Sequence, residues 1–337
     1  MASRLSFATM NLYNLQTSRR RTYPGSTPLG ADLYRAKIRF TARLLREAQA
    51  DVFGFQELWA AEALADAFEE AGLADEYEFV ARDATGVGKP QVAIAARKGM
   101  IEYGGKPADD PGYWIEDFPA EAVFHKRRTI EQVKVEIDSF SRPVVSVMLQ
   151  PEKGPAIRVM VAHLKSKRPM NLDKQERDQP AIAAHEVAIG QALSSIRRTA
   201  EAAALRIVLD QAMADNTVPH VLMGDLNNGS LSVSTGILTG DPRYRLTERQ
   251  RNVTGKRADM GLWSCETLMH LRTQSHTNYS HIYENRLEML DHILVSEEFY
   301  EHSKRRECSF RYGDMFNDNL TRPATRGDIV AALAADR

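Results

Sequence analysis

The chain has 337 residues, a formal net charge of −1 and 43% hydrophobic residues, a composition typical of a globular protein with a large core. The near-zero net charge argues against binding of nucleic acid by bulk electrostatics, although a local basic groove is still compatible with it. The two cysteines, Cys265 and Cys308, are too few for a disulfide framework and lack metal-binding spacing.

The N-terminus leads directly into a strand pattern. Apolar and polar residues alternate from Leu5 to Met10, and Asn11 follows at the predicted strand end. A polar side chain just past a buried strand is where an active-site ligand would lie, although an ordinary loop asparagine is the simpler alternative. No apolar stretch is long enough for a signal segment or a membrane span, so we expect a cytoplasmic protein with no transmembrane segment.

Helix and strand patterns follow in turn. After a basic loop that contains residues 19–21, the apolar spacing predicts a helix with Asp32 as its N-cap. Residues 50–55 predict a second strand, which Gln56 and Glu57 close. A glutamate at the end of an apolar strand is costly to place unless it is paired, and a divalent cation is one such partner.

The next polar strand end is at His163. We predict a helix over residues 59–73 and strands over residues 77–81, 91–97, 133–137, 144–149 and 157–162. His163 ends the last of these strands, and Lys165 and Lys167 follow at alternate positions. A lone histidine at a strand end is usually structural, but this one begins a cationic terminus that suits a phosphate oxygen.

A charged loop and a long helix come next. Residues 169–180 are typical of a charged loop or lid, and residues 181–214 predict the longest helix. We expect Arg197, Arg198 and Arg206 on the solvated face of that helix.

Residues 221–229, Val-Leu-Met-Gly-Asp-Leu-Asn-Asn-Gly, combine an apolar strand with a polar turn. Alternation in a strand predicts that Asp225 and Asn227 point to the same side. The carboxylate would orient or deprotonate a water, and the carboxamide would donate to a developing negative oxygen. The alternative is a strand-to-turn transition that uses common turn residues.

The last patterned segment also contains acidic and basic side chains. A short helix is predicted over residues 262–271, and residues 286–296 predict a strand with Asp291 and His292 in its middle. An aspartate in such a place must be hydrogen-bonded or ionically paired. Since no repeat or linker-like composition shift occurs, we predict that residues 1–337 form a single domain.

Several separate strands therefore each supply polar side chains at one end. This distribution favours a cleft along one edge of stacked sheets over a nucleotide fold with one glycine-rich loop. Hard oxygen donors without a Cys/His cluster suit Mg²⁺ or Mn²⁺. Because Mg²⁺ keeps several waters, Glu57 with Asn11 would be enough to hold it.

Five motifs occur in an order that matches a known family. They are Asn11-Leu12-Tyr13-Asn14, Gln56-Glu57, His163-Leu164-Lys165, Gly224-Asp225-Leu226-Asn227 and Leu290-Asp291-His292-Ile293-Leu294-Val295-Ser296. Together they resemble the endonuclease/exonuclease/phosphatase superfamily, which has the DNase I-like and exonuclease III-like fold. The resemblance implies an α/β protein, a four-layer sandwich of two mixed β-sheets flanked by helices. It also implies a Mg²⁺-dependent hydrolase of phosphoester bonds, of the phosphodiesterase, endonuclease or phosphatase type.

The resemblance also implies residue roles. By motif match, Glu57 would be the metal ligand, with Asn11 adjacent to the metal. Asp225 would activate the attacking water, and His163 and Asn227 would hold the phosphate. These roles agree with the chemistry of in-line attack, which needs an activated water and neutralised oxygens.

The match breaks down at the C-terminus. Family members end in Ser-Asp-His, and the aspartate that matches Asp291 hydrogen-bonds the histidine of this motif. In this chain, residues 323–333 contain no Asp-His pair, and no histidine follows His302. Loss of such a group typically lowers the rate about 10²- to 10⁴-fold. His292 could substitute, although alternation points it to the opposite face, or Arg326 could supply charge. The third alternative is a catalytically impaired member that binds a phosphorylated ligand, but we favour a retained hydrolase.

The substrate is less constrained. Three basic clusters, at residues 19–21, 126–128 and 165–168, would suit a polyanion if they converge, so nucleic acid is one candidate among phosphoester substrates. A lipid substrate would favour an exposed apolar rim, and the sequence shows no obvious one. The sequence does not predict the oligomeric state.

Overall fold

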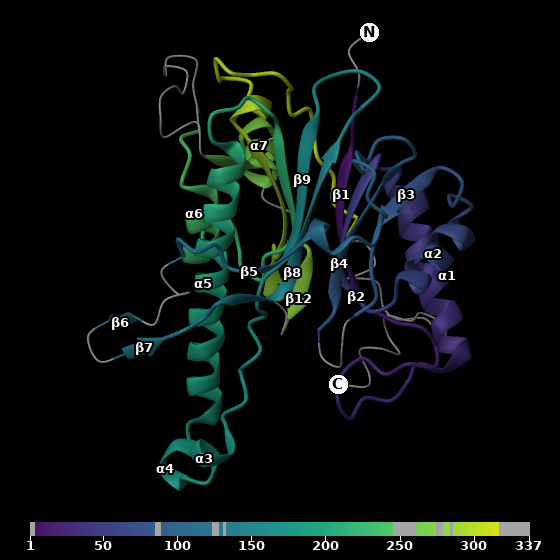
Figure 1. Cartoon of the computed structure of the whole chain (residues 1–337). Coiled ribbons are helices and arrows are strands. Elements are labelled where there is room, and N and C mark those ends of the chain that lie inside the picture. Colours follow the sequence, from purple (N-terminus) through teal and green to yellow (C-terminus); the bar gives the residue numbers. More distant parts are fainter. Residues whose placement is uncertain are drawn as a thin grey trace.

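The structure is a computed structural model that describes residues 4–84, 89–122, 128–130, 133–244, 261–273, 279–283 and 286–316. Two mixed β-sheets pack face to face between layers of helices (Figure 1). The four-stranded sheet has the order β1 (Phe7–Leu15), β2 (Val52–Leu58), β4 (Gln91–Arg97), β3 (Tyr77–Val80). The six-stranded sheet has the order β11 (Leu262–Ser264), β14 (Asp291–Ser296), β10 (His220–Asp225), β9 (Ile157–His163), β8 (Ser139–Leu149), β5 (Trp114–Asp117).

Helices cover the outer faces of both sheets. α1 (Gly30–Ala48) and α2 (Ala61–Ala71) pack on the four-stranded sheet, where Phe68 contacts Phe53 and Phe55. α5 (Glu186–Met213) and α6 (Val233–Thr239) pack on the six-stranded sheet, and α7 (Cys265–Thr273) contacts β14. The predicted four-layer α/β sandwich is therefore confirmed.

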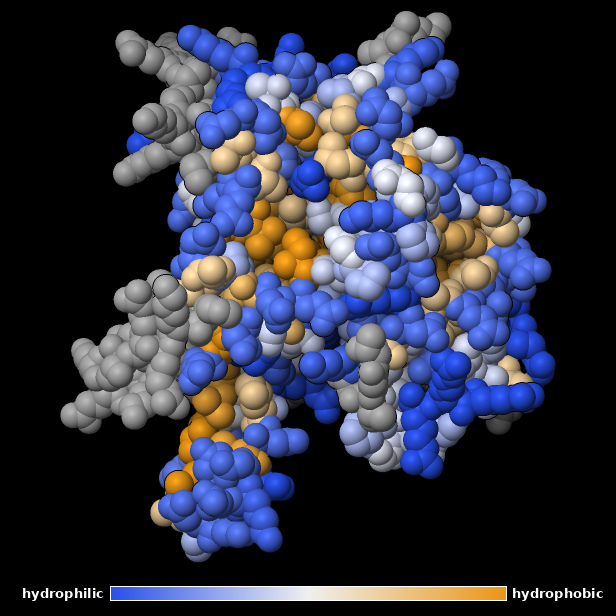
Figure 2. Space-filling model, in the orientation of Figure 1, coloured by the Kyte–Doolittle hydropathy of each residue, from blue (hydrophilic) through white to orange (hydrophobic). Residues whose placement is uncertain are grey.

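Smaller elements complete the described fold. They are the hairpins β6–β7 (Arg128–Ile130, Val133–Val135) and β12–β13 (His281–Tyr283, Arg286–Glu288), the helices α3 (Lys174–Arg177) and α4 (Pro180–Ala183), and two 3₁₀ turns, η1 (Pro111–Tyr113) and η2 (Glu297–Phe299). The α3–α4 end of the molecule extends well beyond the sheets (Figure 1). Apolar side chains, Val187, Leu193 and Ile196 among them, lie exposed along the adjacent half of α5 (Figure 2). No described helix is both long and apolar enough to cross a bilayer.

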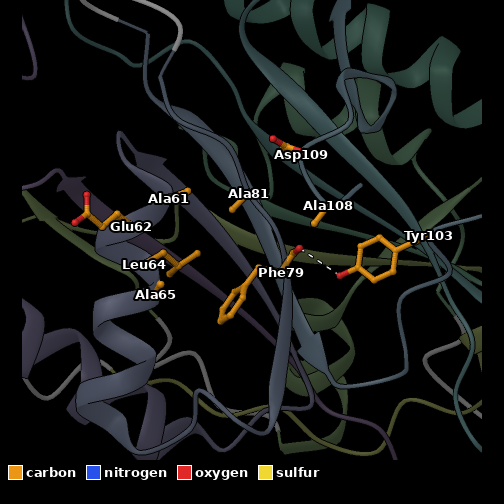
Figure 3. Close-up of a pocket in the computed structure, with 9 residues that line it drawn as sticks. All are labelled: Ala61, Glu62, Leu64, Ala65, Phe79, Ala81, Tyr103, Ala108 and Asp109. Carbon is orange, nitrogen blue, oxygen red and sulfur yellow. Dashed lines mark hydrogen bonds between the residues drawn. The ribbon is translucent and has the colours of Figure 1, made fainter. Parts of the chain in front are cut away.

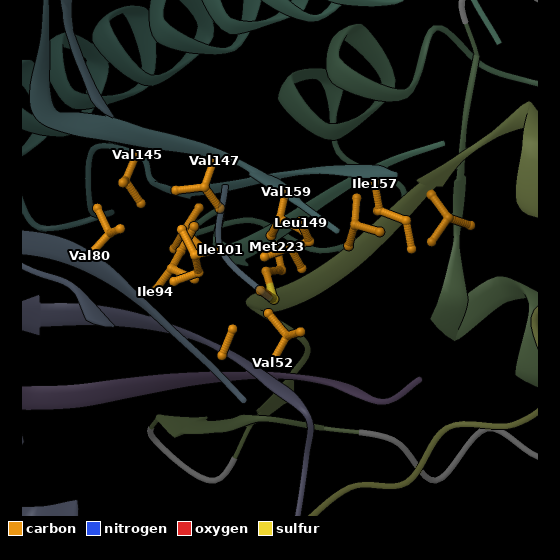
Figure 4. Close-up of a cluster of buried hydrophobic side chains, with 14 of the residues drawn as sticks. Val52, Val80, Ile94, Ile101, Val145, Val147, Leu149, Ile157, Val159 and Met223 are labelled. Atoms are coloured by element: carbon orange, nitrogen blue, oxygen red, sulfur yellow. The ribbon is translucent and has the colours of Figure 1, made fainter. Parts of the chain in front are cut away.

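Apolar side chains from both sheets form the core that holds the two sheets together (Figure 4). Val52 and Ile94 from one sheet meet Val159 and Met223 from the other, all fully buried. The sheets lie close together at Gly54, where an added Cβ would lie 2.7 Å from Val161 Cγ2. Only glycine fits there without displacing a branched core residue.

The structure corrects some of the predicted boundaries in the first sheet. β1 continues to Leu15, so Asn11 lies inside the strand and not at its end. The pairing with β2 continues past Asn11 only after a register shift, because Tyr13 and Asn14 adopt positive φ angles of 48° and 60°. α1 begins at Gly30 with Leu29 as its N-cap, so Asp32 lies in the first turn and is not the cap.

Other boundaries change in the second half of the chain. Residues 262–264 form a strand before α7 begins, so the predicted helix over 262–271 is partly wrong. The predicted strand over 286–296 is two strands, and Asp291 is the first residue of β14 and not its middle. The long predicted helix is divided into α4 and α5, and the charged loop before it contains α3, which has an Asp173/Glu176 capping box. The tail with Arg326 and the cations at 126–127 lie outside the described residues.

Candidate active site

The polar strand ends predicted from the sequence meet at one edge of the stacked sheets. β1 and β2 run parallel, as do β9 and β10, so their carboxyl ends share this edge with the start of β14. Asn11 Nδ2 donates to Asp225 Oδ2 at 3.0 Å and to Glu57 Oε1 at 3.3 Å. His163 Nε2 lies 3.5 Å from Asp225 Oδ2, and Asp291 is the β-ladder partner of Asp225. Both sheets therefore contribute to one cluster.

Gly224 fixes the position of Asp225. Its φ is +145°, and a Cβ there would lie 1.9 Å from the carbonyl oxygen of Ala162. Any other residue would force β10 away from β9. The glycine in the predicted motif thus has a steric reason, since it keeps the two parallel strands close where the carboxylate emerges.

Asn227 reaches the cluster by a different route from the one predicted. β10 ends at Asp225, and Asn227 lies beyond it in a turn with a φ of 55°, so shared strand alternation is the wrong explanation. Its backbone N–H donates to Asp225 Oδ1 at 2.8 Å, and its Nδ2 donates to the Leu164 carbonyl at 3.0 Å. The turn therefore orients both side chains toward the end of β9.

Three carboxyl groups crowd together in this cluster. Burial, then the charge of Asp291 and that of Glu57, raise the pKa of Asp225 to about 8, against hydrogen bonds from Asn227 and Asn11. Burial raises the pKa of Asp291 to about 6, and Glu57 adds to this effect. Asp291 Oδ1 is buried and has no hydrogen-bond partner among the described residues. Such a group of oxygens is unfavourable by itself and favourable around a cation.

The donor set fits a magnesium-type ion. The available ligands are hard carboxylate oxygens, which Mg²⁺ prefers. No three of the described His, Cys, Asp and Glu side chains converge tightly enough to enclose a metal. Asn11 Oδ1 accepts the Tyr13 N–H at 2.8 Å. The side-chain oxygen of Asn11 therefore faces the backbone, and its NH₂ group faces the carboxylates.

The backbone beneath Glu57 is strained. Glu57 has a φ of 59°, and Tyr13 and Asn14 opposite it are also left-handed. Buried Lys37 donates to the Tyr13 carbonyl, and burial lowers the pKa of this lysine to about 8 against the charge of Glu57. Left-handed residues of this kind persist only where their surroundings hold them. Sequence reasoning missed Lys37, although a lysine next to Ile38 on an apolar helix face was a usable signal.

His163 is held neutral by its surroundings. Its side chain is 1% exposed, and burial, together with the charges of Arg142 and Lys165, lowers its pKa well below the usual value. A neutral imidazole presents one N–H donor and one acceptor. Arg142 was also missed from the sequence; it donates from Nη1 to the Leu164 carbonyl at 3.1 Å, the carbonyl that Asn227 uses.

Two of the arginines expected on a solvated face are structural. Arg198 is 5% exposed and donates to the carbonyls of Lys165 and Ser166 at 2.9 and 3.2 Å. The Arg206 side chain is 14% exposed and pairs with Asp210 at 2.7 Å. The helical pattern predicted their spacing but not the loop and helix that pack over them.

A separate cavity lies at the β3 edge of the four-stranded sheet. It has a volume of about 490 Å³ and is formed by the start of α2, β3 and the 103–109 loop (Figure 3). Its lining is mainly apolar, with Glu62 and Asp109 as the charged members. It shares no lining residue with the carboxylate cluster.

Comparison with known proteins gives the family of the fold. The profile of the Endonuclease/Exonuclease/phosphatase family matches residues 8–307, whereas no curated protein is significantly similar in sequence. A family protein from Leptotrichia buccalis is 14% identical, covers 94% of this chain and 93% of its own, and has a TM-score of 0.49. A mannosyl-6-phosphatase from Bacteroides thetaiotaomicron is 13% identical, with coverages of 87% and 85% and a TM-score of 0.46. The human Nocturnin catalytic domain is 14% identical, with coverages of 78% and 76% and a TM-score of 0.41.

Proposed function

Because the chain belongs to the endonuclease/exonuclease/phosphatase family, we propose that it is a Mg²⁺-dependent hydrolase of phosphodiester bonds. The observation that carries this proposal is the hydrogen-bonded cluster of Asn11, Glu57 and Asp225 with His163 beside it. The substrate is a phosphoester, and nucleic acid is one candidate. That residues 1–337 form one domain and that the protein is cytoplasmic remain predictions.

Glu57 would hold the ion, with Asn11 adjacent. A bound Mg²⁺ supplies positive charge that neutralises phosphate oxygens and polarises the phosphoryl group. The strained backbone and the Asn11 amide fix the direction of the Glu57 carboxylate. The buried Oδ1 of Asp291 has no described hydrogen-bond partner, so this oxygen is available to the ion. The Asp291 carboxylate would add its negative charge at the same place.

Asp225 would orient the attacking water and accept its proton. Burial and the neighbouring Asp291 and Glu57 carboxylates raise the pKa of Asp225, which supports a role as a proton acceptor once its charge is compensated. One Asp225 oxygen is held by the Asn227 N–H and the other by the Asn11 amide. The carboxylate is therefore fixed before substrate binds, which removes a reorganisation step from the reaction.

His163 and Asn227 would bind the phosphoryl oxygens. His163 in its neutral form donates through one ring N–H. The Asn227 amide uses one hydrogen on the Leu164 carbonyl and has a second one to donate. Arg142 adds positive charge beside both residues. Such charge stabilises a developing anion without proton transfer, which suits a chain whose C-terminus lacks the Asp-His motif.

Metal dependence tests this proposal directly. Wild-type protein should hydrolyse bis-p-nitrophenyl phosphate with Mg²⁺ or Mn²⁺ and be silent with EDTA, and Glu57→Gln should raise the Mg²⁺ concentration required at least tenfold. Supercoiled plasmid in the same buffers tests whether DNA is a substrate. Equal rates with Mg²⁺ and with EDTA would refute a metal-dependent mechanism. Asp225-dependent turnover would also exclude the binding-only alternative.

A further inference from the structure

A group of cationic side chains lies beside the proposed active site. It is found where the start of β8, the segment after β9 and α5 meet. Buried Glu201, 1% exposed, joins these three segments. Its Oε1 accepts from the Ser141 N–H at 2.8 Å and from Arg197 Nε at 3.2 Å. Its Oε2 accepts from the Lys165 N–H at 2.7 Å. A single carboxylate thus fixes the backbone that presents the cations.

The positive charges in this group exceed the negative ones. Arg142, Arg197 and Arg198 each lie close enough to Lys165 for their charges to act on its ammonium group, and Glu201 is the acidic member. The Lys165 ammonium has only a 3.3 Å hydrogen bond to Ser166 Oγ among the described residues. Arg142 Nε is buried without a described hydrogen-bond partner. Arg197 is paired with Glu201 and also donates from Nη2 to the Ser139 carbonyl at 3.0 Å. Lys165 and Arg142 have no carboxylate partner of this kind among the described residues, and partly desolvated cations are stabilised when an anion binds beside them.

The same side chains border the proposed phosphate site. Arg142 Nη1 and Asn227 Nδ2 share the Leu164 carbonyl at 3.1 and 3.0 Å. Arg142 also hydrogen-bonds the side chain of Tyr23, whose ring packs edge-to-face on Trp59 at 5.0 Å between ring centroids. The cationic group therefore begins where the reacting phosphate would end. An anion bound there would be a neighbour of the reacting group.

We propose that Arg142, Lys165 and Arg197 form a second anion subsite that binds a phosphate group next to the scissile one. This inference rests on the proposed function and narrows its substrate class to phosphoesters that carry a second phosphoryl group. The two guanidinium groups supply positive charge that is spread over several N–H donors, and the lysine adds a point charge. A ligand with a phosphate dianion neutralises this excess of positive charge better than a ligand with a single carboxylate would.

Dinucleotides with and without an added phosphate test the subsite. The thymidine dinucleotide TpT has one phosphodiester, whereas pTpT and TpTp each add a terminal phosphate at one end. Wild-type protein with Mg²⁺ should hydrolyse one of the two phosphorylated forms with a kcat/KM about 10- to 100-fold above that for TpT, the range expected for charge-assisted hydrogen bonds. Lys165→Met should bring that ratio close to one. Lys304→Met, an exposed cation on another part of the surface, should leave it unchanged.

Binding of pyrophosphate provides a second readout without turnover. In metal-free calorimetry, pyrophosphate should bind wild type and Lys304→Met alike, and Lys165→Met at least tenfold more weakly. Turnover of TpT with a wild-type ratio near one, or equal pyrophosphate affinity in all three proteins, overturns the subsite and leaves the proposed function standing. Pyrophosphate binding that requires Lys165, with no hydrolysis of any substrate, instead supports the subsite and rejects the hydrolase.

Discussion

Replacement of Asp291 by asparagine should make the metal-free protein more stable at alkaline pH. Asp291 faces Asp225 across the β10–β14 pair, and its buried Oδ1 has no described hydrogen-bond partner. Burial raises the pKa of Asp291 to about 6 from a usual value of 3.8. The native state therefore holds this proton more tightly than the unfolded state does.

The sign of the pH dependence follows from that difference. Between pH 4 and pH 6 the native state binds more protons, so the free energy of unfolding falls as the pH rises. Above pH 6 the penalty from Asp291 is complete, and a rise from 3.8 to about 6 corresponds to an upper value of about 3 kcal/mol. Asp291→Asn removes this penalty and also lowers the pKa of Asp225, since Asp291 is the second cause of its rise.

Urea unfolding in EDTA at pH 4 and pH 8.5 measures the effect. At pH 8.5 the free energy of unfolding of Asp291→Asn should exceed that of wild type by about 1–3 kcal/mol, and at pH 4 the two should agree. Asp109→Asn, an exposed aspartate, is the matched control and should change neither value. A variant that is less stable than wild type at pH 8.5, or equally stabilised at both pH values, would refute the account of the carboxyl cluster.

Three further substitutions test how the fold supports the site. Gly224→Ala should destabilise the protein by more than about 3 kcal/mol and abolish activity, because its Cβ would lie 1.9 Å from Ala162 O; an unchanged thermal melt contradicts this. Gly54→Ala should lower the free energy of unfolding by about 1–3 kcal/mol. In the double variant, Val161→Ala should recover part of this loss, because it removes the methyl group that the new Cβ meets. If the effects of the two substitutions on urea unfolding simply add, a clash with Val161 is excluded. Arg198→Met removes two hydrogen bonds to backbone carbonyls and should lower the free energy of unfolding by about 1.5–3 kcal/mol. A stability equal to that of wild type would show that these bonds are dispensable.

The fold could largely be predicted from the sequence because its signals are local. Apolar runs that end in Glu57, His163 and Asp225 mark buried strands whose polar ends share an edge once the strands stack. Errors arose where a neighbouring segment decides the backbone. β1 continues past Asn11 because β2 pairs with it beyond a register shift, and Asn227 adopts a left-handed turn that strand alternation does not foresee.

The side chains that were missed depend on long-range packing. Lys37 bonds the carbonyl of a residue 24 positions away, and Arg142 bonds one 22 positions away. Neither has a motif of its own, and each could be recognised only by a cation in an otherwise apolar segment. Arg198 was misplaced for the same reason, since the loop after β9 covers it.

The most direct test of the central proposal is the rate of Mg²⁺-dependent hydrolysis of bis-p-nitrophenyl phosphate by wild type, Asp225→Asn and the control Asp109→Asn. Asp225→Asn keeps the shape of the side chain but cannot accept a proton from water, so its rate should fall about 10²- to 10⁴-fold while the control remains at the wild-type rate. A rate for Asp225→Asn within twofold of wild type would contradict the assignment of Asp225 as the group that activates water.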